Sequence, residues 1–216
     1  MRSILAAVTC ALTVLAAAGC TAKGTPLPDE PTVEDASAYE ALVRTVRDTV
    51  TDIGDTWKGL GAPAVSMQLQ SFRNGEDSPE CGGSTVTTTT VCFYSTPPLL
   101  NWERESMVSL KESGGALAPA ITLAREYGRI LLAAKQVAHS GHIPTLQAEC
   151  LAGVYIHERG AQYTDDVSTE LDDAYEVTAS DAIDPEFKLQ RKVAFYTFAR
   201  TDVGTDPLQA CMDTRF

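Results

Sequence analysis

The sequence has few of the side chains from which metal and nucleic-acid sites are usually built. Its 216 residues include only three histidines, and its 17 basic residues are outnumbered by 29 acidic ones. The formal net charge of −12 disfavours binding to nucleic acid, so we expect no nucleic-acid partner. No two cysteines have the Cys-x-x-C spacing that is typical of structural zinc sites. After the first 20 residues, no apolar run is long enough to cross a bilayer.

The one long apolar stretch lies at the N-terminus. A basic residue precedes the run from Ile4 to Ala18, which has the length of a signal-peptide core and is shorter than a spanning helix. The small residues Ala17-Ala18-Gly19 stand directly before Cys20, as in bacterial lipoproteins, although alanine replaces the usual leucine. The pattern predicts a signal peptide over residues 1–19 and a lipid on Cys20. A secretory signal that is cut elsewhere is the alternative.

The predicted lipid places the protein on the extracytoplasmic face of the cell membrane or outer envelope. Residues 20–36 contain three prolines and little apolar content, which predicts a flexible tether. The remaining residues, 37–216, are long enough for one domain with a hydrophobic core. Because the chain is acidic, we expect it to contact the membrane through the lipid and not through its surface charge.

Four cysteines remain when Cys10 of the signal peptide and the lipidated Cys20 are set aside. They are Cys81, Cys92, Cys150 and Cys211. An even number in an oxidising compartment predicts disulfides, and three pairings are possible. We favour the pairing of the first with the second, which closes a short hairpin-like loop, and of the third with the fourth, which attaches the C-terminus to a helix. A zinc site of four thiolates is the alternative.

The spacing of apolar residues predicts an α+β fold, with a small early sheet followed mostly by helices. Strands are expected over residues 64–72 and within 84–94, with a turn at Asn74-Gly75 between them. Pro97-Pro98 ends the β region. Helices are expected over about residues 32–60, 118–137, from 144 through 154, 166–179 and 185–200.

Several short segments form a pattern that covers about residues 37–216. They are Trp57, Cys81-Gly82, Cys92-Phe93-Tyr94, Arg125-Glu126-Tyr127-Gly128-Arg129, Leu146-Gln147-Ala148-Glu149-Cys150-Leu151-Ala152-Gly153, Gly204-Thr205-Asp206-Pro207 and Cys211-Met212-Asp213-Thr214-Arg215-Phe216. In this order they resemble the bacterial neutral zinc metallopeptidase family, which implies a zincin-like fold. That family carries H-E-V-G-H and E-L-Q-A-D-C-F-A-G in two helices and ends in G-D-P-x-x-C-x-T-F. The segment 146–153 and the C-terminal segment are the most specific parts.

The same resemblance implies zinc ligands that this chain lacks. In H-E-x-x-H, two histidines one helical turn apart bind zinc and the glutamate is the general base. The corresponding histidine positions are Arg125 and Arg129, and the third ligand position is Thr145. Arginine stays protonated and has no lone pair for a metal. We therefore expect no metal, no cofactor and no catalytic residue, with Glu126 as the remnant of the general base.

The sequence is compatible with two roles for the arginine pair. Arg125 and Arg129 can form ion pairs with Glu126 or other nearby acids. They can also hold an anionic group, such as the C-terminal carboxylate of a peptide. A rebuilt metal site that uses His139-x-x-His142 and Glu149 is a further alternative to exposed turn histidines.

Three functions are compatible with these features. The leading hypothesis is a lipid-anchored surface protein whose degenerate, non-catalytic metallopeptidase-like domain binds a protein, a peptide or an envelope component. An active envelope metallopeptidase with an atypical site is the first alternative, and a structural spacer without a ligand is the second. The sequence carries no signature of an oligomeric state. A hydrolytic zinc needs about three protein ligands and a water, and the sequence offers no such set, which favours the leading hypothesis.

The lipoprotein interpretation predicts the behaviour of one substitution. A Cys20→Ala protein should appear in the soluble or secreted fraction, because the lipid is the only membrane attachment that the sequence indicates. Cell fractionation and immunoblotting measure this. Cys10→Ala, which alters only the signal peptide, should leave the protein with the membrane. If the Cys20→Ala protein also stays with the membrane, the lipoprotein interpretation is wrong.

Overall fold

The computed structural model describes residues 33–214 except 74, 76, 139, 180–183 and 203, with the backbone alone for 33–35. Within this part the chain is α+β, as predicted, with seven α-helices and a small mixed sheet. The predicted signal peptide, Cys20 and most of the tether lie outside the described residues. Helix α1 (Val33–Gly59) begins inside the predicted tether, so residues 33–36 are helical. None of the helices in the described ranges is apolar and long enough to span a membrane.

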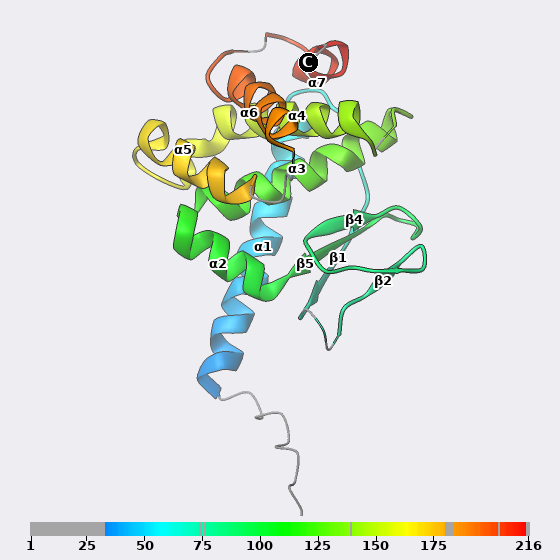
Figure 1. Cartoon of the computed structure of the whole chain (residues 1–216), viewed down its shortest axis with the longest axis vertical. Helices are drawn as coiled ribbons and strands as arrows, with labels where there is room; N and C mark the ends of the chain where they lie inside the picture. The colour runs from blue at the N-terminus through cyan, green and yellow to red at the C-terminus, as the bar shows by residue number, and fades with distance from the viewer. Residues whose placement is uncertain are drawn as a thin grey trace, which may run out of the picture.

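Helix α1 is the longest element, and its N-terminal end projects from the rest of the molecule (Figure 1). Its apolar side chains recur every three or four residues, which places them on one face. Val46, Val50, Ile53 and Trp57 on this face are buried in the core. The helix is followed by Gly61, whose φ of +82° is a conformation that glycine adopts readily.

The sheet has the strand order β1-β5-β4. Its strands are β1 (Gln68–Phe72), β4 (Thr90–Cys92) and β5 (Leu99–Glu103). The central strand β5 is parallel to β1 and antiparallel to β4. A separate two-stranded hairpin is made by β2 (Glu80–Cys81) and β3 (Ser84–Thr85). The predicted β region 84–94 is therefore two short strands in different sheets, and β5 follows the prolines at which the prediction stopped.

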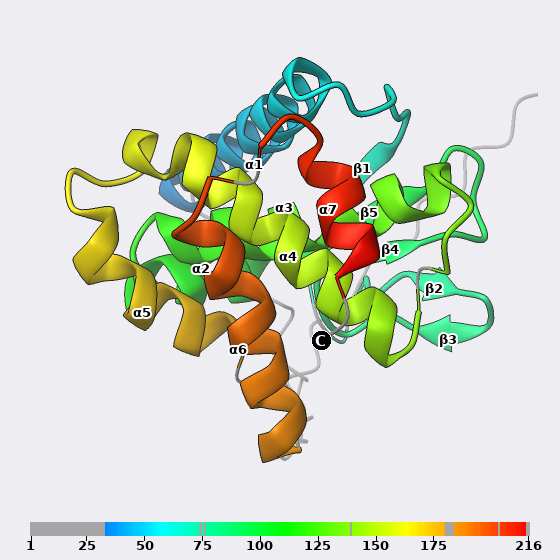
Figure 2. The ribbon, with the colours of Figure 1, turned by 90° about the horizontal axis from the view of Figure 1, so that it is seen from above.

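Helices form the remainder of the described chain. They are α2 (Arg104–Gly114), α3 (Leu117–Ala134), α4 (His142–Arg159), the 3-10 turn η1 (Gly160–Gln162), α5 (Val167–Thr178), α6 (Pro185–Ala199) and α7 (Pro207–Asp213). Helix α4 packs against α3 on one side and α6 on the other, as the view from above shows (Figure 2). Helices α3 and α4 are the most buried, and α3 also contacts β4.

Two glycines allow these central helices to approach closely. A Cβ added at Gly128 of α3 would come within 3.2 Å of the Leu151 side chain on α4. A Cβ added at Gly153 of α4 would overlap the carbonyl oxygen of Phe195 on α6. Both glycines belong to the segments that carry the family resemblance. They set the spacing at which side chains from α3, α4 and α6 can meet.

The two predicted disulfides are confirmed. Cys81–Cys92 joins the hairpin to β4, and Cys150–Cys211 joins α4 to α7. The second bridge closes a loop with a sequence separation of 61, for which chain entropy gives a stabilisation of about 4 kcal/mol. Near it, Gln147 Nε2 donates a hydrogen bond to the carbonyl oxygen of Met212 at 2.8 Å. Because all four thiols are in disulfides, the alternative of a four-thiolate zinc site is wrong.

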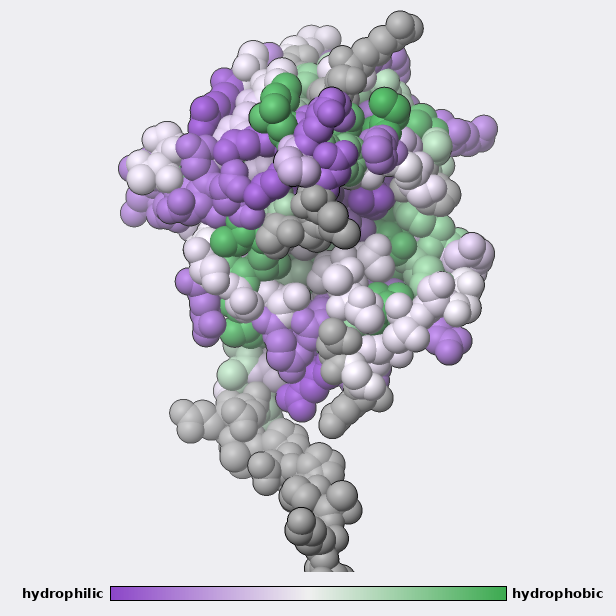
Figure 3. Space-filling view, viewed as in Figure 1, coloured by the Kyte–Doolittle hydropathy of each residue, from purple (hydrophilic) through white to green (hydrophobic). Residues whose placement is uncertain are grey.

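The surface seen in Figure 3 is largely polar. Hydrophilic residues are concentrated around α5, and apolar residues appear as small separate areas and not as one continuous patch. The described chain also has large apolar side chains that are exposed, such as Tyr94 and Leu189. They come from separate parts of the chain, because Tyr94 follows β4 and Leu189 lies on α6. Single exposed apolar residues are normal for globular proteins and do not indicate a functional site. Ligand-binding sites are usually cavities.

Candidate binding pocket

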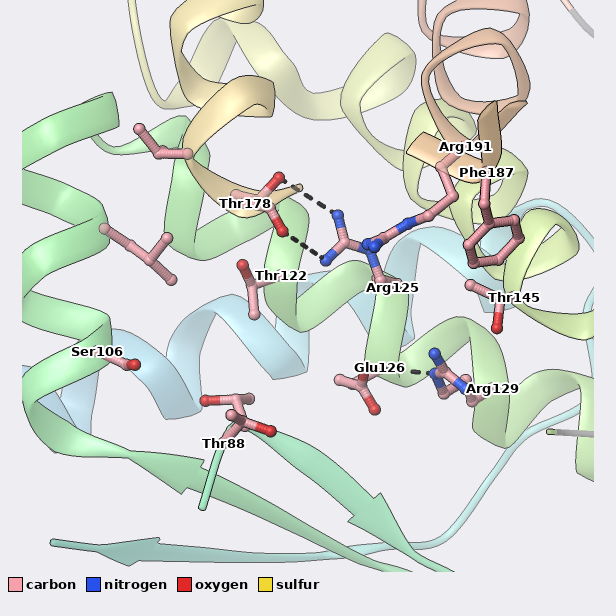
Figure 4. Close-up of a pocket in the computed structure, with 13 residues that line it drawn as sticks. Thr88, Ser106, Thr122, Arg125, Glu126, Arg129, Thr145, Thr178, Phe187 and Arg191 are labelled. Carbon is pink, nitrogen blue, oxygen red and sulfur yellow. Dashed lines mark hydrogen bonds and ion pairs between the residues drawn. The ribbon is translucent and has the colours of Figure 1, made fainter. Parts of the chain in front are cut away.

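A pocket of about 510 Å³ lies where helices α2 to α6 meet the segment that leads into β4 (Figure 4). We call it the arginine pocket. Its lining residues are Thr88, Thr89, Ser106, Leu110, Thr122, Arg125, Glu126, Arg129, Thr145, Val177, Thr178, Phe187 and Arg191. Arg125, Glu126, Arg129 and Thr145, which the sequence analysis singled out from two separate helices, therefore line one cavity. Its volume is within the range of small-molecule and peptide sites.

A buried carboxylate behind the pocket binds two arginines. Oε1 of Glu149, on α4, lies 2.7 Å from Nε of Arg125 on α3. The same oxygen accepts a hydrogen bond of 2.7 Å from Nε of Arg191 on α6, and Nη2 of Arg191 is also at 2.7 Å. The exposed fractions are 0% for Glu149, 5% for Arg125 and 4% for Arg191. We call this arrangement the Glu149 triad, and it connects three helices through charges that are shielded from water.

Arg125 also reaches a fourth helix. Its Nη1 donates to the carbonyl oxygen of Thr178 at 3.2 Å, and its Nη2 donates to Thr178 Oγ1 at 3.3 Å. Thr178 ends α5, where carbonyl groups lack partners within the helix. Beside the triad, burial and the negative charge of Glu149 raise the pKa of Tyr175 well above its usual range, so its phenol stays neutral. Arg125 is thus fixed by contacts to α4 and α5.

The second ion pair of the pocket joins Glu126 and Arg129, one helical turn apart on α3. Nε of Arg129 lies 3.3 Å from Oε1 of Glu126, and the Arg129 side chain is 22% exposed. Oε2 of Glu126 accepts a hydrogen bond of 3.2 Å from the backbone N–H of Val91 in β4. Glu126 therefore connects the sheet to α3 and acts as an ion-pair partner in this structure.

Hydroxyl groups occupy much of the remaining wall. Thr145 Oγ1 donates to the Gly141 carbonyl oxygen at 2.8 Å, and Thr122 Oγ1 donates to that of Ala118 at 3.1 Å. Such bonds within a helix use the hydroxyl hydrogen and leave oxygen lone pairs that can accept hydrogen bonds. Ser106 and Thr88 face the same cavity from α2 and from the loop before β4.

The residues at the three family ligand positions do not fit a zinc ion. Arg125 and Arg129 present permanent cations, and their nitrogens are donors that cannot coordinate a metal. Thr145 supplies a neutral hydroxyl instead of a carboxylate. Among the described residues there is no group of three or more histidines, cysteines or acids arranged to hold a metal. The donor set of the pocket therefore suits an anion and not a divalent cation.

The acid considered for the alternative metal site at the histidine pair has other partners. His139 lies outside the described residues. His142 is exposed at the rim of the pocket, where its ring stacks on Phe187 with a centroid distance of 4.3 Å. Glu149, the acid considered for this site, is buried between two arginines. We therefore assign the described histidine a place on the rim and no role as a ligand.

Sequence reasoning missed Arg191, which completes the triad. A signal for it was present, since Arg191 lies on the same face of α6 as Phe187, Phe195 and Phe198, at spacings of four and seven residues. An arginine on the apolar face of a helix indicates a buried charge that needs a partner. Thr178 had no comparable signal, because its contact with Arg125 depends on how α5 packs against α3.

No family model, no curated protein and no solved structure matches the chain. The resemblance to the zinc metallopeptidases stays a hypothesis that rests on the segments quoted above. The geometry of the arginine pocket does not depend on that hypothesis.

The Glu149 triad predicts unequal effects for two similar substitutions. Glu149→Gln should lower the free energy of unfolding by about 3–5 kcal/mol, because two buried guanidinium groups lose their shared carboxylate. Glu176→Gln is the matched control, since Glu176 also binds two cations, Lys188 and Lys192, but at the surface. We expect a loss of about 1 kcal/mol or less for it. Urea unfolding measures both, and equal losses would contradict the importance of the triad.

Proposed function

We propose that this protein is an envelope lipoprotein whose zincin-like domain has lost its metal and binds an anionic ligand in the arginine pocket. The ligand belongs to a protein, a peptide or another envelope component. In this proposal the domain is not a peptidase. Glu126 contributes to the shape and charge of the pocket and has no catalytic role.

One observation carries the proposal. Arg125, which the family resemblance aligns with the first zinc ligand, is held in the pocket wall by Glu149 and Thr178. An arginine that merely replaced a lost ligand on the surface would have no such set of partners. The buried contacts support the view that this cation belongs to the architecture of the pocket.

The charges around the pocket support an anionic ligand. Among the described residues that line it, together with Glu149 behind it, three arginines face two carboxylates. The arrangement thus has one positive charge in excess, although the chain as a whole has a net charge of −12. Guanidinium groups bind carboxylates and phosphates through charge-assisted hydrogen bonds.

The proposal predicts that the purified mature protein contains far less than one zinc per chain. It also predicts no chelator-sensitive cleavage of an unfolded protein substrate, because the pocket offers cations at the ligand positions. Elemental analysis and a peptidase assay with and without a chelator measure this. Glu126→Gln should change neither result.

The contrary outcome is specific. Zinc bound at one per chain, with chelator-sensitive proteolysis that Glu126→Gln abolishes, would contradict the proposal. It would support the alternative of an active envelope metallopeptidase with an atypical site.

A further inference from the structure

A second cavity lies next to the arginine pocket. This cavity, of about 330 Å³, is lined by Ser106, Ser109, Leu110, Ser113 and Val177, and we call it the serine groove. Three of its lining residues, Ser106, Leu110 and Val177, also line the arginine pocket. The two cavities are therefore adjacent, and we refer to them together as the depression between α2 and α5.

The depression is charged at one end and neutral at the other. The Glu149 triad and the Glu126–Arg129 pair are at one end. The serine groove at the other end is lined by serines and aliphatic side chains without any charge. In Figure 4, Ser106 is drawn on α2, and Thr122 lies between α2 and Arg125. A ligand that matches this pattern has an anionic group at one end and a neutral, hydrogen-bonding chain attached to it.

Arg129 is the arginine best placed to meet the anionic group. Arg125 and Arg191 are almost fully buried and bind Glu149. The Arg129 side chain is 22% exposed and lies beside the hydroxyl of Thr145 in the view of Figure 4. A carboxylate that approaches Arg129 also gains from the excess positive charge behind it.

The length of the serine groove suits a short stretch of extended backbone. From Ser106 to Ser113, α2 advances by about 10 Å at the helical rise per residue. About three residues of extended chain cover this distance. Hydroxyl groups can both donate to carbonyl oxygens and accept from amide N–H groups, so they can pair with a peptide backbone of any sequence.

We infer that the depression binds the C-terminal residues of a peptide, with the terminal carboxylate at Arg129 and the preceding residues in the serine groove. This inference rests on the proposed function, because it names the ligand of the same pocket. Capture of a C-terminal carboxylate is a known mode of peptide recognition, and arginine side chains bind carboxylates well.

The test uses the mature protein in detergent micelles and three pools of fluorescently labelled random peptides. The pools are pentapeptides with a free C-terminal carboxylate, the same pentapeptides with a C-terminal amide, and dipeptides with a free carboxylate. Fluorescence anisotropy should show that pentapeptide acids bind at least about tenfold more tightly than the amides, because a charge-assisted hydrogen bond is lost. They should also bind several-fold more tightly than the dipeptide acids.

Two variants locate the ends of the ligand. Arg129→Gln should remove the preference for acids over amides. Ser109→Trp, at an exposed position, should fill the serine groove and reduce the affinity of the pentapeptide acids to that of the dipeptide acids. Arg200→Gln is the control, because Arg200 is an exposed arginine paired with Asp172, outside both cavities, and should change nothing.

The outcomes separate this inference from the proposed function. A preference for acids that does not depend on peptide length would overturn the inference and leave the proposed function intact. Binding of inorganic phosphate, measured by calorimetry, to a protein that binds no peptide acid would have the same meaning. If neither peptide acids nor inorganic phosphate bind, both the inference and the proposed function are wrong.

Discussion

The carboxylate of Glu149 is the interaction on which the arrangement of the helices most depends. It is fully buried on α4, and one of its oxygens contacts arginines from α3 and α6. Buried ion pairs are not by themselves evidence of high stability, because the desolvation of each charge offsets much of the attraction. Once three charges are buried together, however, removal of one leaves the others without compensation. The triad therefore constrains which packing of these helices is permitted.

The geometry of the pocket follows from that constraint. Gly128 and Gly153 let α3, α4 and α6 approach closely enough for the triad to form. Arg125 then reaches Thr178 and positions the end of α5, while Glu126 reaches the N–H of Val91 and positions β4. Arg125 and Glu126, which make these two contacts, lie on one turn of α3. This turn is the one that aligns with the catalytic motif of the zinc peptidases in the family hypothesis.

The long helices and the disulfides could be predicted from the sequence for clear physical reasons. Helix α1 buries one apolar face, which produces a strong periodic pattern, and α3 is buried on most sides and is apolar over most of its length. The even number of cysteines and their positions restricted the pairings to three, of which the favoured one is confirmed. The clustering of Arg125, Arg129 and Thr145 around one pocket was expected from the resemblance alone, and the structure brings them together.

The elements that were missed have weak local signals. Helix α2 has few apolar residues, and its first turn is capped by Glu103, which is not among the residue types that usually cap helices. Helix α7 has only seven residues, too few for a periodic pattern, although Asp206 before Pro207 is a usual start signal. The serine groove depends on how α2 packs against α5, and no pattern within either segment determines that contact.

The proposed function requires the arginines to form a preorganised anion site. Two-dimensional ¹⁵N–¹H spectra of the arginine Nε–H groups test it most directly, during a titration with a peptide acid. We expect the Nε–H signals of Arg125 and Arg191 to be protected from solvent exchange before any ligand is added. During the titration, Arg129 should show the largest saturable shift. Exposed arginines such as Arg200 should not change. Rapid solvent exchange at Arg125 and Arg191, or shifts spread equally over the surface arginines, would contradict a preorganised anion site in the arginine pocket.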